Sequence, residues 1–188
     1  MEKVSINQSI RLSEHITLGE VTKSRHAEIY NIPSHVAIEN LKRVCAWLEE
    51  LRRRYNLRYV LPLSRGSQKG SEPPHSSPAQ TTPNPSYSGG EKDTEEPIII
   101  TSGYRSAELN RKVGGSPTSN HLTGCAVDIR VAGIEQAMRY AVILMDYADE
   151  TKQDYDELFI EKNRYGAIWL HFAVRPKDNR RKTAFLQT

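Results

Sequence analysis

Residues 125–131 read Cys-Ala-Val-Asp-Ile-Arg-Val and alternate between two kinds of side chain. The branched apolar residues fall on one side of an extended chain, and Ala126, Asp128 and Arg130 fall on the other. This pattern predicts a strand that turns one face to a core. Asp128 stands between two apolar neighbours, where a carboxylate is costly unless it is paired or binds a ligand.

The segments around this strand predict the rest of a small sheet. Residues 98–101 form a β-branched run after Pro97, which indicates a buried strand. Residues 157–162 and 167–174 predict two further strands, joined by a turn at 163–166 that reads Asn-Arg-Tyr-Gly. These last two strands are expected to pair antiparallel.

Helical patterns precede and separate the strands. A capping box at residues 17–20 predicts a first helix that extends to about Tyr30. A second helix begins near Ser34, where apolar side chains start to recur at spacings of three and four. Residues 106–113 and 134–149 predict two more helices. The order of elements favours an α+β fold with a small antiparallel sheet and flanking helices over a doubly wound parallel sheet.

The composition excludes several classes of protein. The 188 residues suit one domain, and 26 basic against 23 acidic residues give a net charge of only +3, so we expect no nucleic-acid partner. No apolar run approaches the ~20 residues that cross a bilayer, and residues 1–5 do not begin a secretory signal. Two cysteines cannot build a disulfide framework or a thiolate zinc cluster. Any metal site must therefore use histidine and carboxylate.

Two segments stand apart from the core pattern. Residues 64–96 hold five of the ten prolines, and their only apolar residues are Ala79 and Tyr87. Such a segment buries too little surface to offset its ordering entropy, so we predict a disordered insertion within a single domain that spans 1–188. Residues 175–182 are basic and are expected to form a solvated terminus.

Two histidines have a context that suits chemistry. His121 lies in a loop that leads into the strand of Asp128, and His171 lies within the strand at 167–174 on the same side as Trp169. Two histidines and a carboxylate make a three-ligand zinc site that leaves a position for water. A His121–Asp128 hydrogen bond beside an unrelated core histidine is the alternative that the residues leave open.

The motifs together resemble a known family. Residues 102–106 (SGYRS), 119–128 (SxHxxGxAxD) and 169–171 (WxH) resemble the zinc D-alanyl-D-alanine carboxypeptidases of peptidase family M15, above all its phage-like and bacterial wall-peptidase branch. Residues 12–20 look like the helical lead-in of many of those proteins. The resemblance implies the Hedgehog/DD-peptidase-like α+β fold and a Zn²⁺ cofactor.

The resemblance also implies roles for particular residues. His121, Asp128 and His171 match the zinc ligands. Arg105 matches the arginine that holds substrate and stabilises developing negative charge, and Ser119 matches a polar residue beside the site, either a substrate contact or a loop cap.

The catalytic base departs from the usual pattern. Many family members carry a glutamate three residues before the last zinc histidine, where this chain has Ile168. We expect Glu161 to replace it, because a two-residue turn at 164–165 places Glu161 directly opposite Ile168. Asp156 and Glu157 are further from the turn and are less favoured.

The implied activity is hydrolysis of peptidoglycan stem peptides by a monomeric zinc metallopeptidase. Removal of a terminal D-alanine and cleavage within the stem, as by an L-Ala–D-Glu-type endopeptidase, both stay open. A non-catalytic Hedgehog-like zinc module that binds cell-wall or protein ligands is the alternative, which the isoleucine at 168 keeps open. Without a signal, we expect a protein kept in the cytoplasm until release, as phage lysins are, that then acts at the cell wall.

Overall fold

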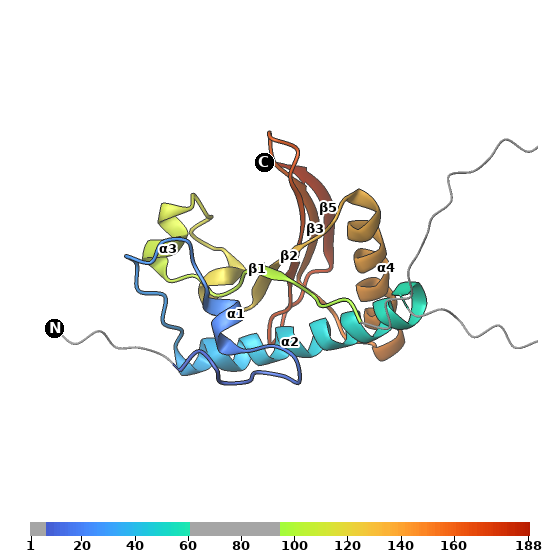
Figure 1. Ribbon diagram of the computed structural model, residues 1–188, viewed down its shortest axis with the longest axis horizontal. Coiled ribbons are helices and arrows are strands. Elements are labelled where there is room, and N and C mark those ends of the chain that lie inside the picture. Colours follow the sequence, from blue (N-terminus) through green and yellow to red (C-terminus); the bar gives the residue numbers. More distant parts are fainter. Residues whose placement is uncertain (1–6, 61–94) are drawn as a thin grey trace, which may run out of the picture.

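The computed structural model describes residues 7–60 and 95–188 (Figure 1). Within these ranges, one sheet has the strand order β1-β2-β4-β3-β5. The strands are β1 (Ile100–Ser102), β2 (Ala126–Arg130), β3 (Glu157–Lys162), β4 (Ile168–Ala173) and β5 (Lys182–Gln187). The helices are α1 (Leu18–Thr22), α2 (His35–Tyr55), α3 (Ala107–Lys112) and α4 (Ile134–Thr151), with a π-helical turn at Asn56–Val60 and a 3-10 turn at Asn120–Thr123. The α+β class is confirmed.

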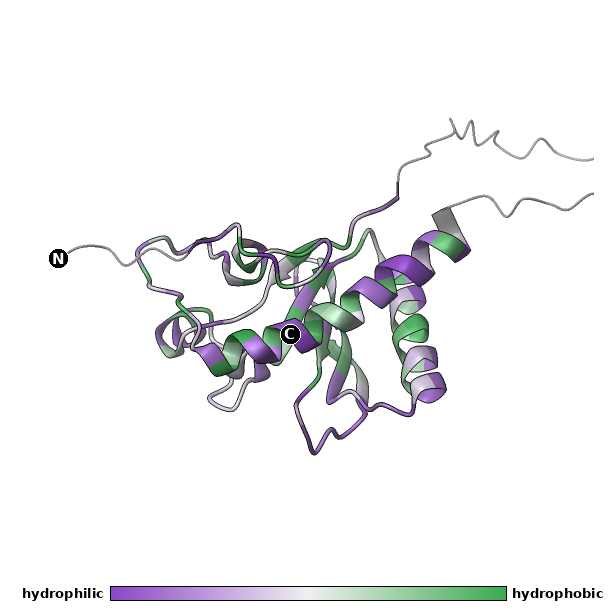
Figure 2. Ribbon diagram, turned by 90° about the horizontal axis from the view of Figure 1, so that it is seen from below, coloured by the Kyte–Doolittle hydropathy of each residue, from purple (hydrophilic) through white to green (hydrophobic). Residues whose placement is uncertain are grey.

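The core lies between one face of the sheet and the helices α2 and α4. Figure 1 shows α2 crossing below the strands and α4 standing beside them. The ring of Trp47 on α2 packs 4.8 Å from that of Tyr147 on α4 and 5.4 Å from that of Phe172 on β4. The alternation of hydrophilic and hydrophobic residues along α2 is visible in Figure 2. The opposite face of the sheet is left for polar side chains.

The predicted helices and strands are largely confirmed. The helix α2 begins after Ser34, whose hydroxyl accepts from the amide of Ala37. The first helix is the exception, since α1 ends at Thr22 rather than near Tyr30. Lys23 is extended. The capping box is present at its start, but no apolar face continues beyond Thr22 to hold the chain helical.

The fifth strand corrects two expectations. The strands β1, β2, β4 and β3 pair antiparallel as predicted, whereas β5 pairs parallel with β3, so the sheet is mixed. The basic segment is also not a solvated terminus: Arg180 forms an ion pair with the fully buried carboxylate of Asp156, at 2.6 Å. That ion pair docks the segment on β3 and starts the parallel ladder.

The turn between β3 and β4 differs from the prediction by one residue. The amide of Asn163 donates to the carbonyl of Ala167, so three residues form the loop and Gly166 takes a left-handed conformation, with φ of 87°. The side-chain oxygen of Asn163 accepts from the amides of Tyr165 and Ala167 and fixes this longer loop. Glu161 therefore lies opposite Trp169, and Lys162 lies opposite Ile168.

The insertion predicted at 64–96 falls outside the described residues except for its last two. Among the helices that are described, none is both long and apolar enough to span a membrane.

Candidate metal centre

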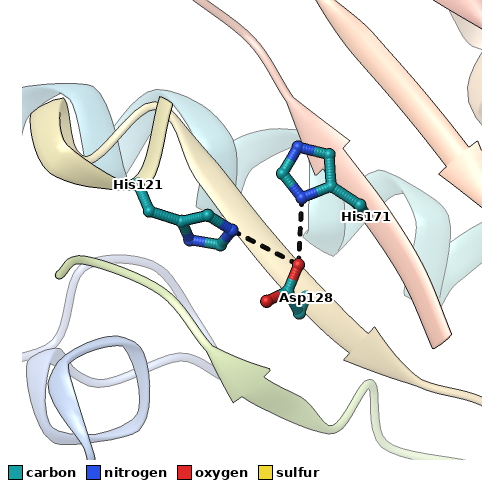
Figure 3. Close-up of side chains that lie close together, drawn as sticks. All are labelled: His121, Asp128 and His171. Carbon is teal, nitrogen blue, oxygen red and sulfur yellow. Dashed lines mark hydrogen bonds and ion pairs between the residues drawn. The ribbon is translucent and has the colours of Figure 1, made fainter. Parts of the chain in front are cut away.

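Three side chains converge on the polar face of the sheet. One oxygen of Asp128 lies 3.3 Å from Nε2 of His121 and 2.9 Å from Nδ1 of His171 (Figure 3). All three residues are buried, and one ligand atom from each lies within 4.8 Å of the others. Tetrahedral zinc with bonds of about 2.0–2.1 Å places its ligand atoms about 3.3 Å apart. The spacing and the donor set therefore suit a metal ion.

Sheet pairing brings two of these residues together. Asp128 on β2 and His171 on β4 are direct partners in the antiparallel register, so their side chains leave the same face. The branched apolar residues of β2, Val127 and Ile129, face the core instead, as the alternation predicted. The carboxylate is thus placed beside the imidazole by pairing between segments that are distant in sequence.

The third candidate ligand, His121, is positioned by a short capped turn. His121 lies in the 3-10 turn Asn120–Thr123, and Ser119 caps that turn by accepting from the amide of His121 at 3.3 Å. Gly124 ends the turn with φ of 72°, and a Cβ there would lie 2.5 Å from the carbonyl oxygen of Ala37. Only glycine meets both conditions. Ser119 therefore has a capping role, and its contact with substrate stays a prediction.

An acceptor behind each ring sets which nitrogen faces the carboxylate. The carbonyl oxygen of Gly103 lies 2.6 Å from Nδ1 of His121, and Oε2 of Glu157 lies 3.4 Å from Nε2 of His171. A carbonyl and a carboxylate only accept, so these nitrogens carry the hydrogens. The opposite nitrogens, Nε2 of His121 and Nδ1 of His171, face Asp128, and these are the atoms that would bind a metal held by all three residues.

Glu157 is a residue whose role the sequence did not reveal. The sequence favours Glu161 over it as the base, yet Glu157 lies on the polar face of β3 and contacts His171. Asn120 donates to Glu157 at 2.9 Å and to Asp156 at 2.8 Å, and Arg180 donates to both carboxylates. Strand register, which sets this face, was the signal that could have found it.

The electrostatics of the cluster favour ionised groups. Burial of Asp128 raises its pKa, but His121 and His171 outweigh burial and hold that pKa well below its usual range. Burial opposes protonation of His171, but hydrogen bonds to Asp128 and Glu157 raise its pKa to about 9. A metal cation that binds at the cluster would compete with protons for the nitrogen atoms of the histidines.

Arg105 reaches the same carboxylate from the loop after β1. Its Nη2 donates to the second oxygen of Asp128 at 2.6 Å, and its Nε donates to the hydroxyl of Ser102 at 2.9 Å. The guanidinium thus lies against the cluster and is fixed there by two contacts. The structure places the predicted arginine beside the predicted ligands.

Glu161 lies on the same face of β3 as Glu157, four residues further along the strand. Its register partner is Trp169, which belongs to the polar face with His171, and not Ile168, which packs against the core. Burial raises the pKa of Glu161; the charge of Asp128 adds to this effect, and those of His171 and Arg105 oppose it. The corrected register therefore keeps Glu161 near the cluster, whereas the predicted pairing would turn it to the core.

A family model described as Peptidase M15 matches residues 90–156, which include Arg105, His121 and Asp128 but end before β4. A search of curated proteins found no match. The match confirms the resemblance that the motifs carry over residues 90–156.

Proposed function

We propose that the protein is a zinc-dependent peptidase that cleaves peptidoglycan stem peptides. The observation that carries the proposal is the buried cluster of His121, Asp128 and His171 beside Glu161 on one face of the sheet. The family match supports peptide hydrolysis. The motif resemblance supports a Hedgehog/DD-peptidase-like fold and a wall substrate.

The three clustered residues would hold the ion. Zinc, when bound, lowers the pKa of a water molecule and polarises a carbonyl group. Glu161 takes the proton of the attacking water and passes it to the leaving amine, a task that suits a carboxylate whose pKa is raised by burial. Arg105 stabilises the negative charge that develops on the scissile carbonyl oxygen.

Two bonds of the stem peptide are candidates for cleavage. Removal of a terminal D-alanine and cleavage between L-Ala and D-Glu both fit the resemblance. The products of defined muropeptides, identified by mass spectrometry, distinguish them. Action at the cell wall, release from the cytoplasm and a monomeric state are predictions from the sequence.

The test is a muropeptide digest of the purified protein with and without a chelator. We expect the chelator to abolish hydrolysis and added zinc to restore it. Glu161→Gln should keep its zinc, measured by elemental analysis, and lose about 10²- to 10⁴-fold in turnover. His121→Ala should lose the metal itself.

Glu108→Gln is the matched control, because Glu108 is an exposed carboxylate on α3. Normal turnover in Glu161→Gln would contradict the assignment of the base. Bound zinc without hydrolysis by the unaltered protein would favour the second candidate, a non-catalytic zinc module. That candidate rests on Ile168, which places no carboxylate at the position usual in the family.

A further inference from the structure

The strand β5 is the last in the order β1-β2-β4-β3-β5, so within the described part of the chain no strand pairs with its outer edge. Its inner edge bonds to β3, where the amide of Lys182 donates to the carbonyl oxygen of Asp156 at 3.0 Å. In a parallel ladder, alternate residues turn both of their backbone groups to the same side. The N–H and C=O groups of residues 183, 185 and 187 therefore point away from the sheet.

The sequence of β5 lacks the features that keep edge strands from pairing. Natural edge strands avoid association through charged side chains, proline or a β-bulge. Residues 183–187 read Thr-Ala-Phe-Leu-Gln, without charge or proline, and Lys182 is the only charged residue of the strand. All residues of β5 follow the register with β3 without interruption, so this ladder has no bulge. The outer edge can thus accept a further strand.

Apolar side chains are exposed on both faces of this strand. Phe185 is 56% exposed and lies beside Ile160, on the face of the sheet that carries the core. Leu186 is 37% exposed and lies beside Glu161, on the polar face. A strand that pairs with the edge contacts both side chains and also satisfies the outward backbone groups. A helix would cover one face and leave those groups unpaired, so the surface fits an extended chain.

The outward residues of β5 match those of a second copy of the same strand. When two copies run antiparallel with Phe185 opposite Phe185, Thr183 of each copy lies opposite Gln187 of the other. Every one of these pairs joins two residues whose backbone groups point outward. Such pairs form the closely spaced hydrogen bonds of an antiparallel ladder, in which both residues donate and both accept. The edge is therefore complementary to itself.

Charge and size set the strength of this contact. In the same register Lys182 lies opposite Thr188 of the second copy, so no like charges meet across the edge. The two copies of Phe185 face each other with Cβ atoms about 5 Å apart, a separation at which aromatic pairs are favourable. A contact made by one strand is smaller than a standard interface of about 1,200–2,000 Å², so we expect a dissociation constant of about 10–100 μM.

We infer that the chain forms a dimer in which β5 of two copies pairs antiparallel about a twofold axis at Phe185, so that the two sheets join into one. The axis is perpendicular to the sheet, and the polar faces of both copies therefore lie on the same side. Five strand spacings of about 4.8 Å separate the two copies of β4, which places the two His171 residues roughly 25 Å apart. This dimer takes the place of the monomer expected from the sequence, an expectation that did not include β5. It does not depend on the proposed function.

Sedimentation velocity of the purified protein at about 1 to 500 μM measures the association. We expect a monomer at the lowest concentrations and a dimer at the highest, with or without zinc. Phe185→Lys places two like charges opposite each other and should raise the dissociation constant about tenfold or more. Val113→Lys is the matched control, because Val113 is an exposed apolar residue at the end of α3, outside β5, and it should leave the association unchanged.

Amide hydrogen exchange, followed by NMR, locates the interface in the unaltered protein. The amides of residues 184 and 186 face β3 and should be protected at every concentration, whereas those of 183, 185 and 187 should gain protection only as the dimer forms. A protein that stays monomeric up to about 500 μM would overturn the inference. A dimer in which those three amides gain no protection, or in which Phe185→Lys associates normally, would overturn it as well.

Discussion

Gly103 holds two parts of the molecule together without a side chain. Its carbonyl oxygen accepts from His121, and a Cβ on this residue would lie 2.3 Å from the carbonyl oxygen of Val21 on α1. The loop of residues 102–106 can thus lie against α1 only because position 103 has no side chain. The hydrogen bond between His121 and the Gly103 carbonyl oxygen fixes the orientation of this candidate metal ligand.

Gly103→Ala should therefore weaken both the fold and the metal site. We expect a loss of about 1–3 kcal/mol in the free energy of unfolding, measured with urea, because backbone must move to admit the methyl group. Zinc affinity, measured by chelator competition, should fall as His121 loses its acceptor. Gly133→Ala is the control, since Gly133 is extended and has open space around its Cβ position. Equal effects of the two variants would contradict the argument.

At the scale of elements, the periodicity of apolar side chains predicted the helices and strands well. The register of the β3–β4 pair was predicted wrongly by one residue. The apolar spacing of α2 and the alternation of β2 follow from which side chains face the core, so both elements could be predicted from the sequence. The turn after β3 depends on whether the side chain of Asn163 accepts two amides, which a count of turn residues does not reveal. A one-residue shift turns a side chain to the other face.

In the candidate site, too, features local in the sequence could be predicted, and features that depend on strand pairing could not. The three candidate ligands were recognisable through the motifs that carry the family resemblance, since residue types and spacing alone left a simple His121–Asp128 hydrogen bond open, and the structure brings all three together. Glu157 and Arg180 join the cluster only through pairing of β3 with its neighbours. A pairing of distant segments, and hence the role of β5, leaves little trace in the residues themselves.

The helix α2 allows a pH test that is separate from the metal. Hydrogen bonds from Arg53 lower the pKa of Glu50 to about 2 against the effect of burial, and Arg54 adds to this effect. A lowered pKa stabilises the fold above the ordinary value of 4.5, and the contribution disappears as the pH falls from about 4.5 to about 2. Glu50→Gln should cost about 0.5–1 kcal/mol at pH 6. Urea unfolding from pH 7 to pH 2 should show the two proteins converging in acid, and a constant difference would count against the pairing.

At the scale of the whole molecule, the segment after β4 ties the fold to the site. Asp156 is fully buried and accepts from Nε and Nη2 of Arg180 at 2.7 and 2.6 Å. The same Nη2 donates to Glu157, which in turn contacts His171. Residues at the edge of the sheet thus support a candidate metal ligand, His171, at its centre.

Arg180→Gln should show this link in two measurements. Removal of the guanidinium leaves the buried carboxylate of Asp156 without its main partner, and we expect a loss of about 2 kcal/mol, less than for a fully enclosed pair because Arg180 is partly exposed. Zinc affinity should fall about tenfold as Glu157 loses its position. Arg181→Gln is the control, because Arg181 pairs with the exposed Asp149 and Asp154. A normal zinc affinity in Arg180→Gln would refute the link.

The distribution of the three ligands along the chain has a kinetic consequence. His121 and Asp128 come from one short stretch, whereas His171 arrives only when β4 has paired with β2. A metal ion bound by all three is a cross-link that closes a loop of chain between residues 121 and 171. If that loop closes only after the sheet is assembled, we expect a bound ion to leave the rate of folding unchanged and to slow unfolding, which refolding and unfolding rates measured with and without zinc would check.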